Sequence, residues 1–331
     1  MGSDMKVAHR IKITAAAIAL AGAVTVCANA QTYPNRSIKL VVPFAPGGTT
    51  DVIARIIAAS ITPHINGQTM VIENRAGAGG GTGATETSQA APDGYSLGVA
   101  TVSTIATVPA FNPKTKYDPI SDFTPIINIA ATPNILTVHP SFPAKDFAGF
   151  MESVKKAPGK YSYASSGTAS ILHLQMELFK NLTKTDIVHV PYSGSGPALN
   201  DAVAGQVPMI FDNLPTSLQH VLGGRLIPIA VAAAQRTPTL PNVPTFTDVG
   251  LPEMNRMAFY GIYGPKGLPR EVVDTINRAV KQTMADASVR KRIEDTGSVL
   301  IGNTPEEFAA QIRAEFAVYK KVVAEQNLKP E

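Results

Sequence analysis

The sequence predicts an α/β fold with two lobes. Its first apolar segment, Ile38 to Val42, contains β-branched residues and stops at Pro43, and a helical apolar pattern begins at Val52. The same order of strand, loop and helix recurs after Val138 with different residues, in Tyr161 to Ala164, Ser165 to Ser170 and Ile171 to Lys180. Removing a leader of 30 residues from the 331 leaves 301, which is enough for two domains of ordinary size.

The leader, residues 1–30, is typical of a secretory signal peptide. Its basic start, apolar core and small-residue cleavage site are Lys6, Arg10 and Lys12, then Ile13 to Val26, then Ala28 to Ala30. The apolar core is too short to span a bilayer comfortably. Cleavage after Ala30 removes Cys27, the single cysteine, so the mature chain forms no intramolecular disulfide. We therefore expect a periplasmic protein; whether Met1 to Asp4 belong to the natural chain stays open.

Charge and composition exclude two classes of partner. The whole chain carries 29 basic and 25 acidic residues, and the leader takes three and one of these, which leaves 26 minus 24, or +2. No basic tract is interleaved with aromatic residues, and tryptophan is absent, so we expect no nucleic-acid partner. No segment after the leader has the roughly 18 unbroken apolar residues of a membrane span.

The loop after the first strand is the main candidate for ligand contact. Pro46-Gly47-Gly48 permits a tight turn and close approach to the backbone, and we expect a positive φ at Gly48. Thr49, Thr50 and Asp51 then offer side chains to cap the helix. Unpaired amides and a positive helix end would suit an anion. The alternative is an ordinary β-to-α turn.

A glycine tract follows the next predicted strand, Thr69 to Glu73. Within it Gly79-x-Gly81-x-x-Ala84 has the spacing of a dinucleotide fingerprint, but the acidic residue expected about 20 positions later is missing. We interpret the tract as a turn that opens a helix from Ala84 to Ala90, and expect no cofactor.

Hydroxyl residues follow the strand Ser96 to Ala100. Thr101 to Thr104 would lie at a carboxyl edge, where open α/β sheets bind ligands, although ordinary helix capping is the alternative. Phe111 to Pro125 is predicted as a surface loop. Two strands, Ile126 to Ile129 and Ile135 to Val138, are expected on either side of a loop, Ala131 to Asn134.

The second set of elements starts with a helix from Phe147 to Lys156. The strand Tyr161 to Ala164 leads into a polar loop, Ser165 to Ser170, and then the helix Ile171 to Lys180. His173 and Glu177 have the i, i+4 spacing of a metal pair, but no further cluster accompanies them, so we expect a capped helix with a buried histidine and no metal.

Two more strand ends supply candidate residues. Ile187 to Val190 leads to Tyr192-Ser193-Gly194-Ser195-Gly196 and a helix from Ala198 to Ala204, and Ser195 lacks the first glycine of a nucleophile elbow. Pro208 to Phe211 ends at Asp212. The remaining predicted elements are the strands Ile227 to Ala232 and Arg256 to Pro265 and the helices Pro269 to Asp286, Ser288 to Thr296 and Thr304 to Gln326; apolar residues at helical spacing, including Phe308 and Ile312, should pack the last helix on the sheet.

Five motifs in order resemble the Bug (TctC) extracytoplasmic solute receptors of tripartite tricarboxylate transporters. They are Pro43-Phe44-x-Pro46-Gly47-Gly48-x-x-Asp51-x-x-Ala54-Arg55, Glu73-Asn74-Arg75-x-Gly77-Ala78-Gly79-Gly80, Ala91-Pro92-Asp93-Gly94-Tyr95, Pro191-Tyr192-x-Gly194-x-Gly196-Pro197-Ala198 and Phe211-Asp212-Asn213. The resemblance covers nearly all of the mature chain. One departure is Phe259-Tyr260, where many relatives carry a tryptophan. The shape of the rear of the pocket, and with it the exact substrate, therefore does not follow from the resemblance.

The resemblance implies a two-lobed periplasmic-binding-protein fold of the type II kind, with a ligand cleft between the lobes and two crossing hinge strands. The lobes would be 31–132 with 256–331, and 133–255. Family members bind small carboxylates, including acidic amino acids and dicarboxylates, often through backbone amides and ordered waters. The implied function is capture of such an acid for inner-membrane subunits like TctA and TctB, by a monomer and without catalysis.

Carried onto this chain, the resemblance implies contacts from Phe44 to Thr50, Thr101 to Thr104, Ser165 to Ser170, Tyr192 to Gly196 and Asp212. The residues selected from these ranges are Phe44, Ala45, Gly47, Gly48, Thr49, Thr50, Thr101, Ser103, Ser165, Ser166, Gly167, Thr168, Ala169, Tyr192, Gly194 and Asp212. Two other functions stay open: a ligand-sensing partner of a membrane sensor kinase, which needs the same fold, and a periplasmic hydrolytic enzyme, which lacks a recognised catalytic arrangement.

The selected loops contain no Lys or Arg, so dipoles would have to hold the acid. Asp212 would repel a second carboxylate and attract an ammonium group, which favours glutamate or aspartate over a plain diacid. The alternative is that Asp212 caps a helix and never meets the ligand. The exact ligand and its affinity are not determined by the sequence.

The leader generates a testable prediction. Protein recovered from the periplasm should begin at Gln31, because Ala28-Asn29-Ala30 follows a short apolar core. Intact-mass measurement decides this, and a mature form that keeps a lipid-modified Cys27 would contradict it.

Overall fold

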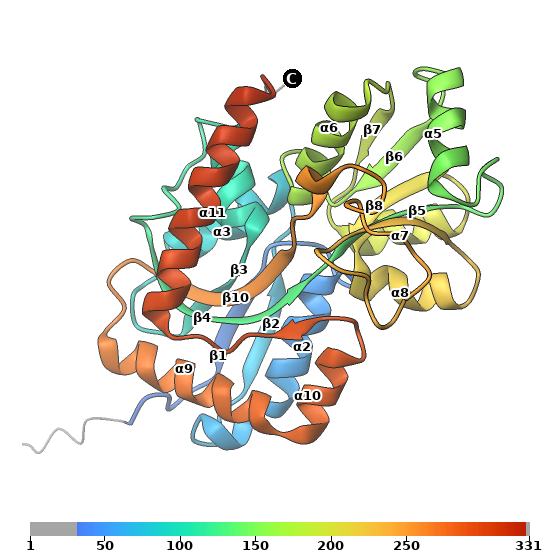
Figure 1. Cartoon of the computed structure of the whole chain (residues 1–331). Coiled ribbons are helices and arrows are strands. Elements are labelled where there is room, and N and C mark those ends of the chain that lie inside the picture. Colours follow the sequence, from blue (N-terminus) through green and yellow to red (C-terminus); the bar gives the residue numbers. More distant parts are fainter. Residues whose placement is uncertain (1–31, 329–331) are drawn as a thin grey trace, which may run out of the picture.

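A computed structural model describes residues 32–328, so the predicted signal peptide lies outside the described residues. Figure 1 shows two lobes, each with a sheet between layers of helices. The strands are β1 (Ile38–Val42), β2 (Met70–Asn74), β3 (Ser96–Thr101), β4 (Phe123–Thr132), β5 (Asn134–Val138), β6 (Ser162–Ser165), β7 (Val188–Pro191), β8 (Met209–Asn213), β9 (Ile227–Ala232), β10 (Ala258–Pro265) and β11 (Val299–Leu300). The helices are α2 (Thr49–Ser60), α3 (Gly81–Ser88), a π-helix (Ser103–Thr107), α4 (Val108–Phe111), α5 (Phe147–Lys156), α6 (Ile171–Thr183), α7 (Ser195–Val203), α8 (Leu214–Leu222), α9 (Arg270–Ala285), α10 (Ala287–Glu294) and α11 (Pro305–Glu325).

The first lobe is built on a six-stranded sheet with the order β11-β4-β10-β3-β1-β2. β1 pairs in parallel with β2 and β3, whereas β10 runs antiparallel to β3 and β4. Helices α2, α9 and α10 lie on one side of this sheet, and α3 and α11 lie on the other (Figure 1). Phe308 of α11 is fully buried and packs edge-on against Phe259 of β10, as the helical spacing predicts.

The second lobe is built on a five-stranded sheet with the order β7-β6-β8-β5-β9. Alternate residues of a strand face opposite layers, so Leu136 joins the core beside α5 and α6 whereas Ile135 joins the core beside α8. Both faces of this sheet are therefore covered, as an α/β layer architecture requires.

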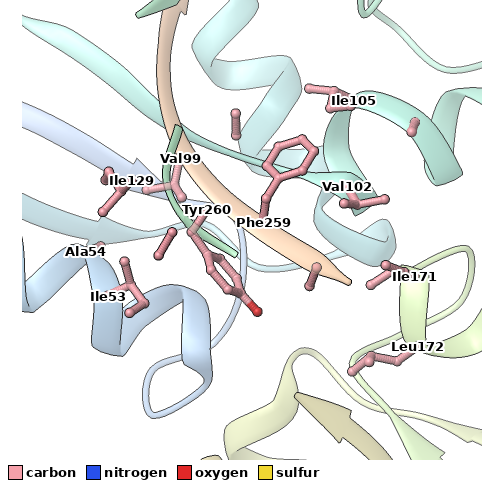
Figure 2. Close-up of a cluster of buried hydrophobic side chains, with 14 of the residues drawn as sticks. Ile53, Ala54, Val99, Val102, Ile105, Ile129, Ile171, Leu172, Phe259 and Tyr260 are labelled. Carbon is pink, nitrogen blue, oxygen red and sulfur yellow. The ribbon is translucent and has the colours of Figure 1, made fainter. Parts of the chain in front are cut away.

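The apolar core continues to the boundary between the lobes. Figure 2 shows Val102 and Ile105 of the first lobe approaching Ile171 and Leu172 of the second. All four side chains are at most 4 % exposed. The same view shows the Tyr260 hydroxyl directed away from Val99 and Ile129, out of the apolar cluster.

Several predicted boundaries were wrong. β4 continues through Ala131 and Thr132, so only Pro133 separates it from β5, where a four-residue loop was expected. Three helices start earlier than predicted, α2 at Thr49, α3 at Gly81 and α7 at Ser195. The π-helix, α4, α8 and β11 were not predicted at all. Within the predicted surface loop, Tyr117 is buried and donates a hydrogen bond to the carbonyl of Thr104 at 2.6 Å.

The two crossings between the lobes are held by buried amide side chains. Asn213 donates to Asn134 at 2.6 Å, and Asn134 donates to Gln175 and to the carbonyl of Arg256. Gln175 in turn donates to the carbonyls of Met254 and Arg256, each at 3.1 Å. Asn134 adjoins Pro133 at the first crossing, and Arg256 lies at the second, so one network ties both to the second lobe.

We expect Gln175→Leu to lower the free energy of unfolding by about 1–3 kcal/mol, because it leaves buried carbonyls and the Asn134 amide without their partner. Urea unfolding measures the change. Gln89→Leu, at an exposed position after α3, is the control and should change stability by less than about 0.5 kcal/mol. Equal effects of the two replacements would show that the network contributes no stability.

Candidate functional site

A small cavity lies where the two lobes meet. Its volume is about 20 Å³, room for about one water molecule. The first lobe and the segment entering it contribute Phe44, Gly48, Thr49, Thr50, Thr101, Val102, Ser103, Ala258 and Tyr260, and the second lobe contributes Ser166, Ile171, Ser195 and Asn213. None of these lining residues is Lys or Arg.

Three helix N-termini without side-chain caps meet at this cavity. The N-cap residues of α2 and α7 are Gly48 and Gly194, which have no side chain, and that of α8 is Asn213, whose side chain accepts no hydrogen bond from the helix. The cavity is lined by Gly48 and Asn213 and by Ser195, the first residue of α7. Since the first amides of a helix lack intrahelical acceptors, and its N-terminus carries partial positive charge, the cavity is suited to an anion.

Asp51 fixes the loop that precedes α2. Its carboxylate accepts from the Gly47 amide at 3.0 Å, from Arg55 Nε at 2.8 Å and from Asn74 Nδ2 at 2.9 Å. Burial alone would raise the pKa of this carboxyl, but the hydrogen bonds from Arg55, Asn74 and Gly47 outweigh it and the pKa is lowered. The expected caps at Thr49, Thr50 and Asp51 were wrong, because these residues form the first turn and Gly48 is the N-cap.

Hydrogen bonds across the boundary hold the lobes together. The Ala45 amide donates to the Ser193 carbonyl at 3.1 Å, and the hydroxyls of Thr49 and Thr216 are 3.1 Å apart. On the other side of the cavity, the Ile171 amide donates to Ser103 Oγ at 3.1 Å and Thr107 Oγ1 donates to the Ala169 carbonyl at 2.6 Å. The cavity is enclosed between these two sets of contacts.

Seven of the residues selected from the sequence line the cavity: Phe44, Gly48, Thr49, Thr50, Thr101, Ser103 and Ser166. Ala45 and Gly47 line a separate groove of about 630 Å³, and Thr168 and Ala169 line another of about 600 Å³. The rest do not line it: Ser165 and Gly167 are buried in their loop, Tyr192 donates to Asp201 at 2.7 Å, and Gly194 is the cap of α7.

Asp212 faces its own lobe. It is fully buried, and its Oδ2 accepts from Thr216 Oγ1 at 2.7 Å and from Ser217 Oγ at 2.9 Å, both on α8. Burial raises the pKa of this carboxyl, although nearby hydroxyls, Ser195 included, oppose the shift. Its neighbour Asn213 lines the cavity instead. Asp212 thus holds α8 through Oδ2 and is not a lining residue, but its Oδ1 has no hydrogen-bond partner among the described residues and the carboxyl is close enough to Tyr260 to raise the pKa of that hydroxyl.

Tyr260 also lines the cavity, although the resemblance did not place it among the ligand-contacting residues. It is 2 % exposed, and its hydroxyl makes no hydrogen bond of standard geometry among residues 32–328, although Thr49 and Asp212 lie close enough to affect its pKa. Burial raises its pKa well above the usual value, so the hydroxyl stays a proton donor at neutral pH. Ala258 lies two residues before it on β10 and lines the same cavity, which the period of two along a strand could have indicated.

The expected positive φ at Gly48 was wrong, because its φ is −83°. The residue of this loop with a positive φ is Gly47, at +84°. A Cβ on Gly48 would lie 3.4 Å from the Cβ of Ser195. That distance is an ordinary contact, so a Cβ alone would fit at position 48, whereas a branched side chain would meet the facing lobe.

The chain was compared with known proteins. The family model described as tripartite tricarboxylate transporter family receptor (TctC) matches residues 53–328. Protein BugT of Bordetella pertussis is 32 % identical over 302 residues, 91 % of this chain and 92 % of that protein. A solved structure of a periplasmic transporter is 51 % identical with a TM-score of 0.88, covering 90 % of this chain and 99 % of that one. MatC from Rhodopseudomonas palustris with bound malate is 35 % identical with a TM-score of 0.85, covering 88 % of this chain and 100 % of that one.

We expect Asp212→Asn to raise the melting temperature relative to the parent, by an increment that grows with pH. Because burial raises the pKa of Asp212 in the folded protein, the parent loses stability as the pH rises through that value, whereas asparagine has no charge to bury. Melting curves at several pH values test this. Asp274→Asn, which removes a charge from an exposed side chain on α9, is the control. An increment that shrinks as the pH rises would show that the fold favours the charged form.

Proposed function

The chain belongs to the tripartite tricarboxylate transporter receptor family, and we propose that it captures a small carboxylate in the periplasm and delivers it to inner-membrane transporter subunits like TctA and TctB. The observation that carries this proposal is the meeting of the uncapped N-termini of α2 and α7 at one cavity with no lining cation. The third end, α8, adds mainly its dipole, because its Leu214 amide already donates to the Pro133 carbonyl and Pro215 has no amide hydrogen. Amides of this kind bind a carboxylate by charge-assisted hydrogen bonds, each contributing about 1.5–3 kcal/mol. We propose binding without catalysis as the role of this site.

A plain dicarboxylate suits the cavity better than an acidic amino acid. Asp212, the residue expected to attract an ammonium group, does not line the cavity, and its Oδ2 is engaged by two hydroxyls of α8. The groups left at the cavity include the α2 and α7 amides and the Tyr260 hydroxyl, which are donors to oxygen. MatC, a similar receptor, was solved with malate. We therefore take L-malate as the first probe.

Capture requires the lobes to separate, since a cavity of about 20 Å³ is smaller than any dicarboxylate. We propose that residues 31–132 with 256–331 move against residues 133–255, with bending confined to the two crossings. Closure would then bring Thr49 to Thr216 and Ser103 to Ile171 around the bound acid. No helix among the described residues is long and apolar enough to cross a membrane.

Calorimetry with L-malate, adipate, citrate, L-aspartate and L-glutamate tests the proposal. We expect a dicarboxylate to bind more tightly than the amino acid of the same carbon number, and the bound acid to be recovered chemically unchanged. Since the interactions are buried, raising NaCl from about 0.05 to 0.5 M should change Kd by less than about threefold. Conversion of the acid, or no binding by any member of the panel, would overturn the proposal.

Gly48→Val tests whether the close approach of the two lobes at position 48 is needed for binding. Its backbone lies in the β region that valine accepts, so we expect normal folding, but the side chain would meet Ser195 and obstruct closure. Affinity should fall at least about tenfold, or roughly 1.4 kcal/mol. Ala59→Val, at an exposed position on the same helix, is the control and should bind like the parent.

A further inference from the structure

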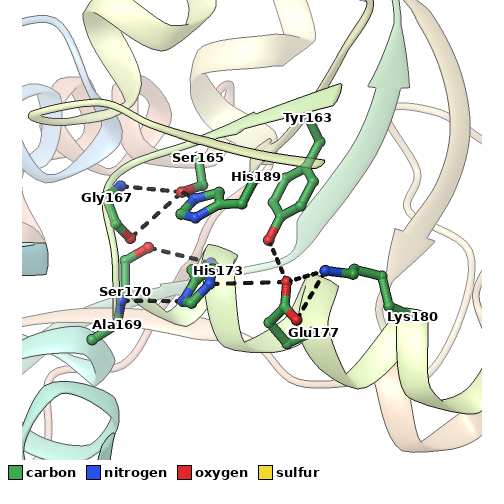
Figure 3. Close-up of polar contacts among 9 residues, drawn as sticks. All are labelled: Tyr163, Ser165, Gly167, Ala169, Ser170, His173, Glu177, Lys180 and His189. Carbon is green, nitrogen blue, oxygen red and sulfur yellow. Dashed lines mark hydrogen bonds and ion pairs between the residues drawn. The ribbon is translucent and has the colours of Figure 1, made fainter. Parts of the chain in front are cut away.

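Two histidines of the second lobe lie directly behind the loop that touches the cavity. His173 on α6 and His189 on β7 stack with ring centroids 4.1 Å apart, and neither lines the cavity (Figure 3). The loop in front of them, residues 165–170, contributes Ser166 to the cavity and the Ala169 carbonyl to the contact with Thr107. The function proposed above does not use either imidazole.

Each histidine holds one end of this loop. The Ala169 amide donates to His173 Nδ1 at 3.2 Å, and His189 Nε2 lies 2.6 Å from Ser165 Oγ. Ser165 Oγ also accepts from the Gly167 amide at 3.2 Å. Because Ala169 has a φ of +66° and Gly167 a φ of +121°, the loop holds a conformation that local preference does not supply. The contacts to His173 and His189 stabilise this conformation of the loop.

The bond to Ala169 sets the protonation state of His173. A nitrogen that accepts an amide hydrogen carries no proton, so the proton of neutral His173 is on Nε2, which faces Glu177 Oε1 at 3.9 Å. Protonation of Nδ1 would turn an acceptor into a second donor aimed at the Ala169 amide. It would also place a positive charge against the stacked His189 ring.

The surroundings oppose such a charge. Burial, with Lys180 as a second cause, lowers the pKa of His173 to about 4. Burial, followed by His173, lowers that of His189 to about 3, although Glu177 acts in the opposite direction. The other groups facing the pair are Tyr163 of β6, whose hydroxyl donates to Glu177 at 3.0 Å, Phe111 of α4, edge-on to His173, and, around the same groove, Asp186, Gln326 and Asn327. Lys180 binds Glu177 at 2.8 Å, so that carboxylate is already paired.

A serine nucleophile activated by histidine is the other reading of the Ser165–His189 contact. Ser165 is completely buried, and its oxygen already accepts the Gly167 amide. A nucleophile has to reach its substrate, so this hydroxyl serves the loop.

We propose that His173 and His189 are positioning residues for ligand capture, which in their neutral forms preset the loop of residues 165–170 for closure on the first lobe. The inference rests on the proposed function, because it assigns the loop to the carboxylate site. Only the fraction of protein with a preset loop binds tightly, so the apparent affinity follows the neutral fraction of His173. Acidification therefore raises the Kd for the ligand, because it protonates His173 and releases the loop.

The first test compares Kd for L-malate between the parent and two variants. At pH 7, His173→Asn should bind within about threefold of the parent, because asparagine offers an oxygen near the position of Nδ1, whereas His173→Leu should bind at least about tenfold more weakly. The ratio of parent Kd to His173→Asn Kd should be up to about twofold higher at pH 4 than at pH 7, because the pKa of His173 is lowered only to about 4, so the parent is partly protonated at pH 4, whereas asparagine does not titrate. Titration of the ligand itself cancels in this ratio.

His139→Asn is the matched control, at a histidine whose Nδ1 is 2.7 Å from Ser141 Oγ on the exposed surface. It should keep the parent's pH profile. The proposal is overturned if His173→Leu binds like the parent at pH 7, or if His173→Asn keeps the parent's pH profile. If His173→Leu does not fold, the asparagine variant decides.

A second readout does not depend on the ligand. In ¹⁵N NMR of the parent, His173 Nδ1 should be unprotonated at pH 7, and the Ala169 amide shift should titrate with the same midpoint as the His173 ring. If L-malate fails to bind but this coupling is present, the choice of ligand is wrong and the positioning role stands. A protonated Nδ1 at pH 7, or an Ala169 amide that does not follow the ring, rejects the positioning role whatever the ligand.

Discussion

The close approach of helices α2 and α7 across the lobe boundary is the constraint on which the site depends. Gly48 caps α2 and faces Ser195, and a Cβ on Gly196 would collide with the Pro46 carbonyl. With this little space the ends of the helices carry no capping side chains, so their amides remain available. Two positive helix ends that face each other repel, and an anion between them relieves that repulsion, by up to about 2 kcal/mol for each helix in a partly buried geometry. The proposed closure and the proposed binding of an acid would therefore be coupled.

Such an approach needs rigid loops, and the first of these is held by Asp51 and Asn74. Asn74 donates both to the Phe44 carbonyl, at 3.0 Å, and to Asp51, so the end of β2 is tied to the turn after β1. Asp51 and Asn74 are 23 positions apart in the sequence, and their hydrogen bond makes them one clamp on the turn after β1. Asp51 lies in the first turn of α2 and pairs with Arg55, so the clamp places no net charge at the helix end.

The sequence contained enough information for the order of the long strands and helices, because their apolar periodicity reflects which face is buried, whereas the burial of Tyr117 in the expected surface loop was missed. It placed the starts of α2, α3 and α7 too late, since Thr49, Gly81 and Ser195 have weak helix preference and are helical through packing at the lobe boundary. It missed α8, where Pro215 stands in the first turn and reads as a break, although proline suits that position. At the site, the backbone motifs located seven lining residues. The orientation of Asp212 against Asn213 depends on strand register, which periodicity in one strand does not determine.

The hydrogen bonds at the two crossings also restrict where the lobes can bend. The second lobe holds the Pro133 carbonyl through the Leu214 amide, at 2.9 Å, and the Arg256 carbonyl through Asn134 and Gln175. The first sheet holds the next residues on the other side, because Thr132 of β4 pairs with Ala258 of β10. The free backbone between these anchors is the Thr132–Pro133 junction in one crossing and the step from Arg256 to Ala258 in the other. Rotation about these short segments leaves both sheets intact, and Asn213, which lines the cavity, belongs to the same amide network. A cavity-lining residue is thus bonded, through Asn134, to the crossings at which we propose that the lobes bend.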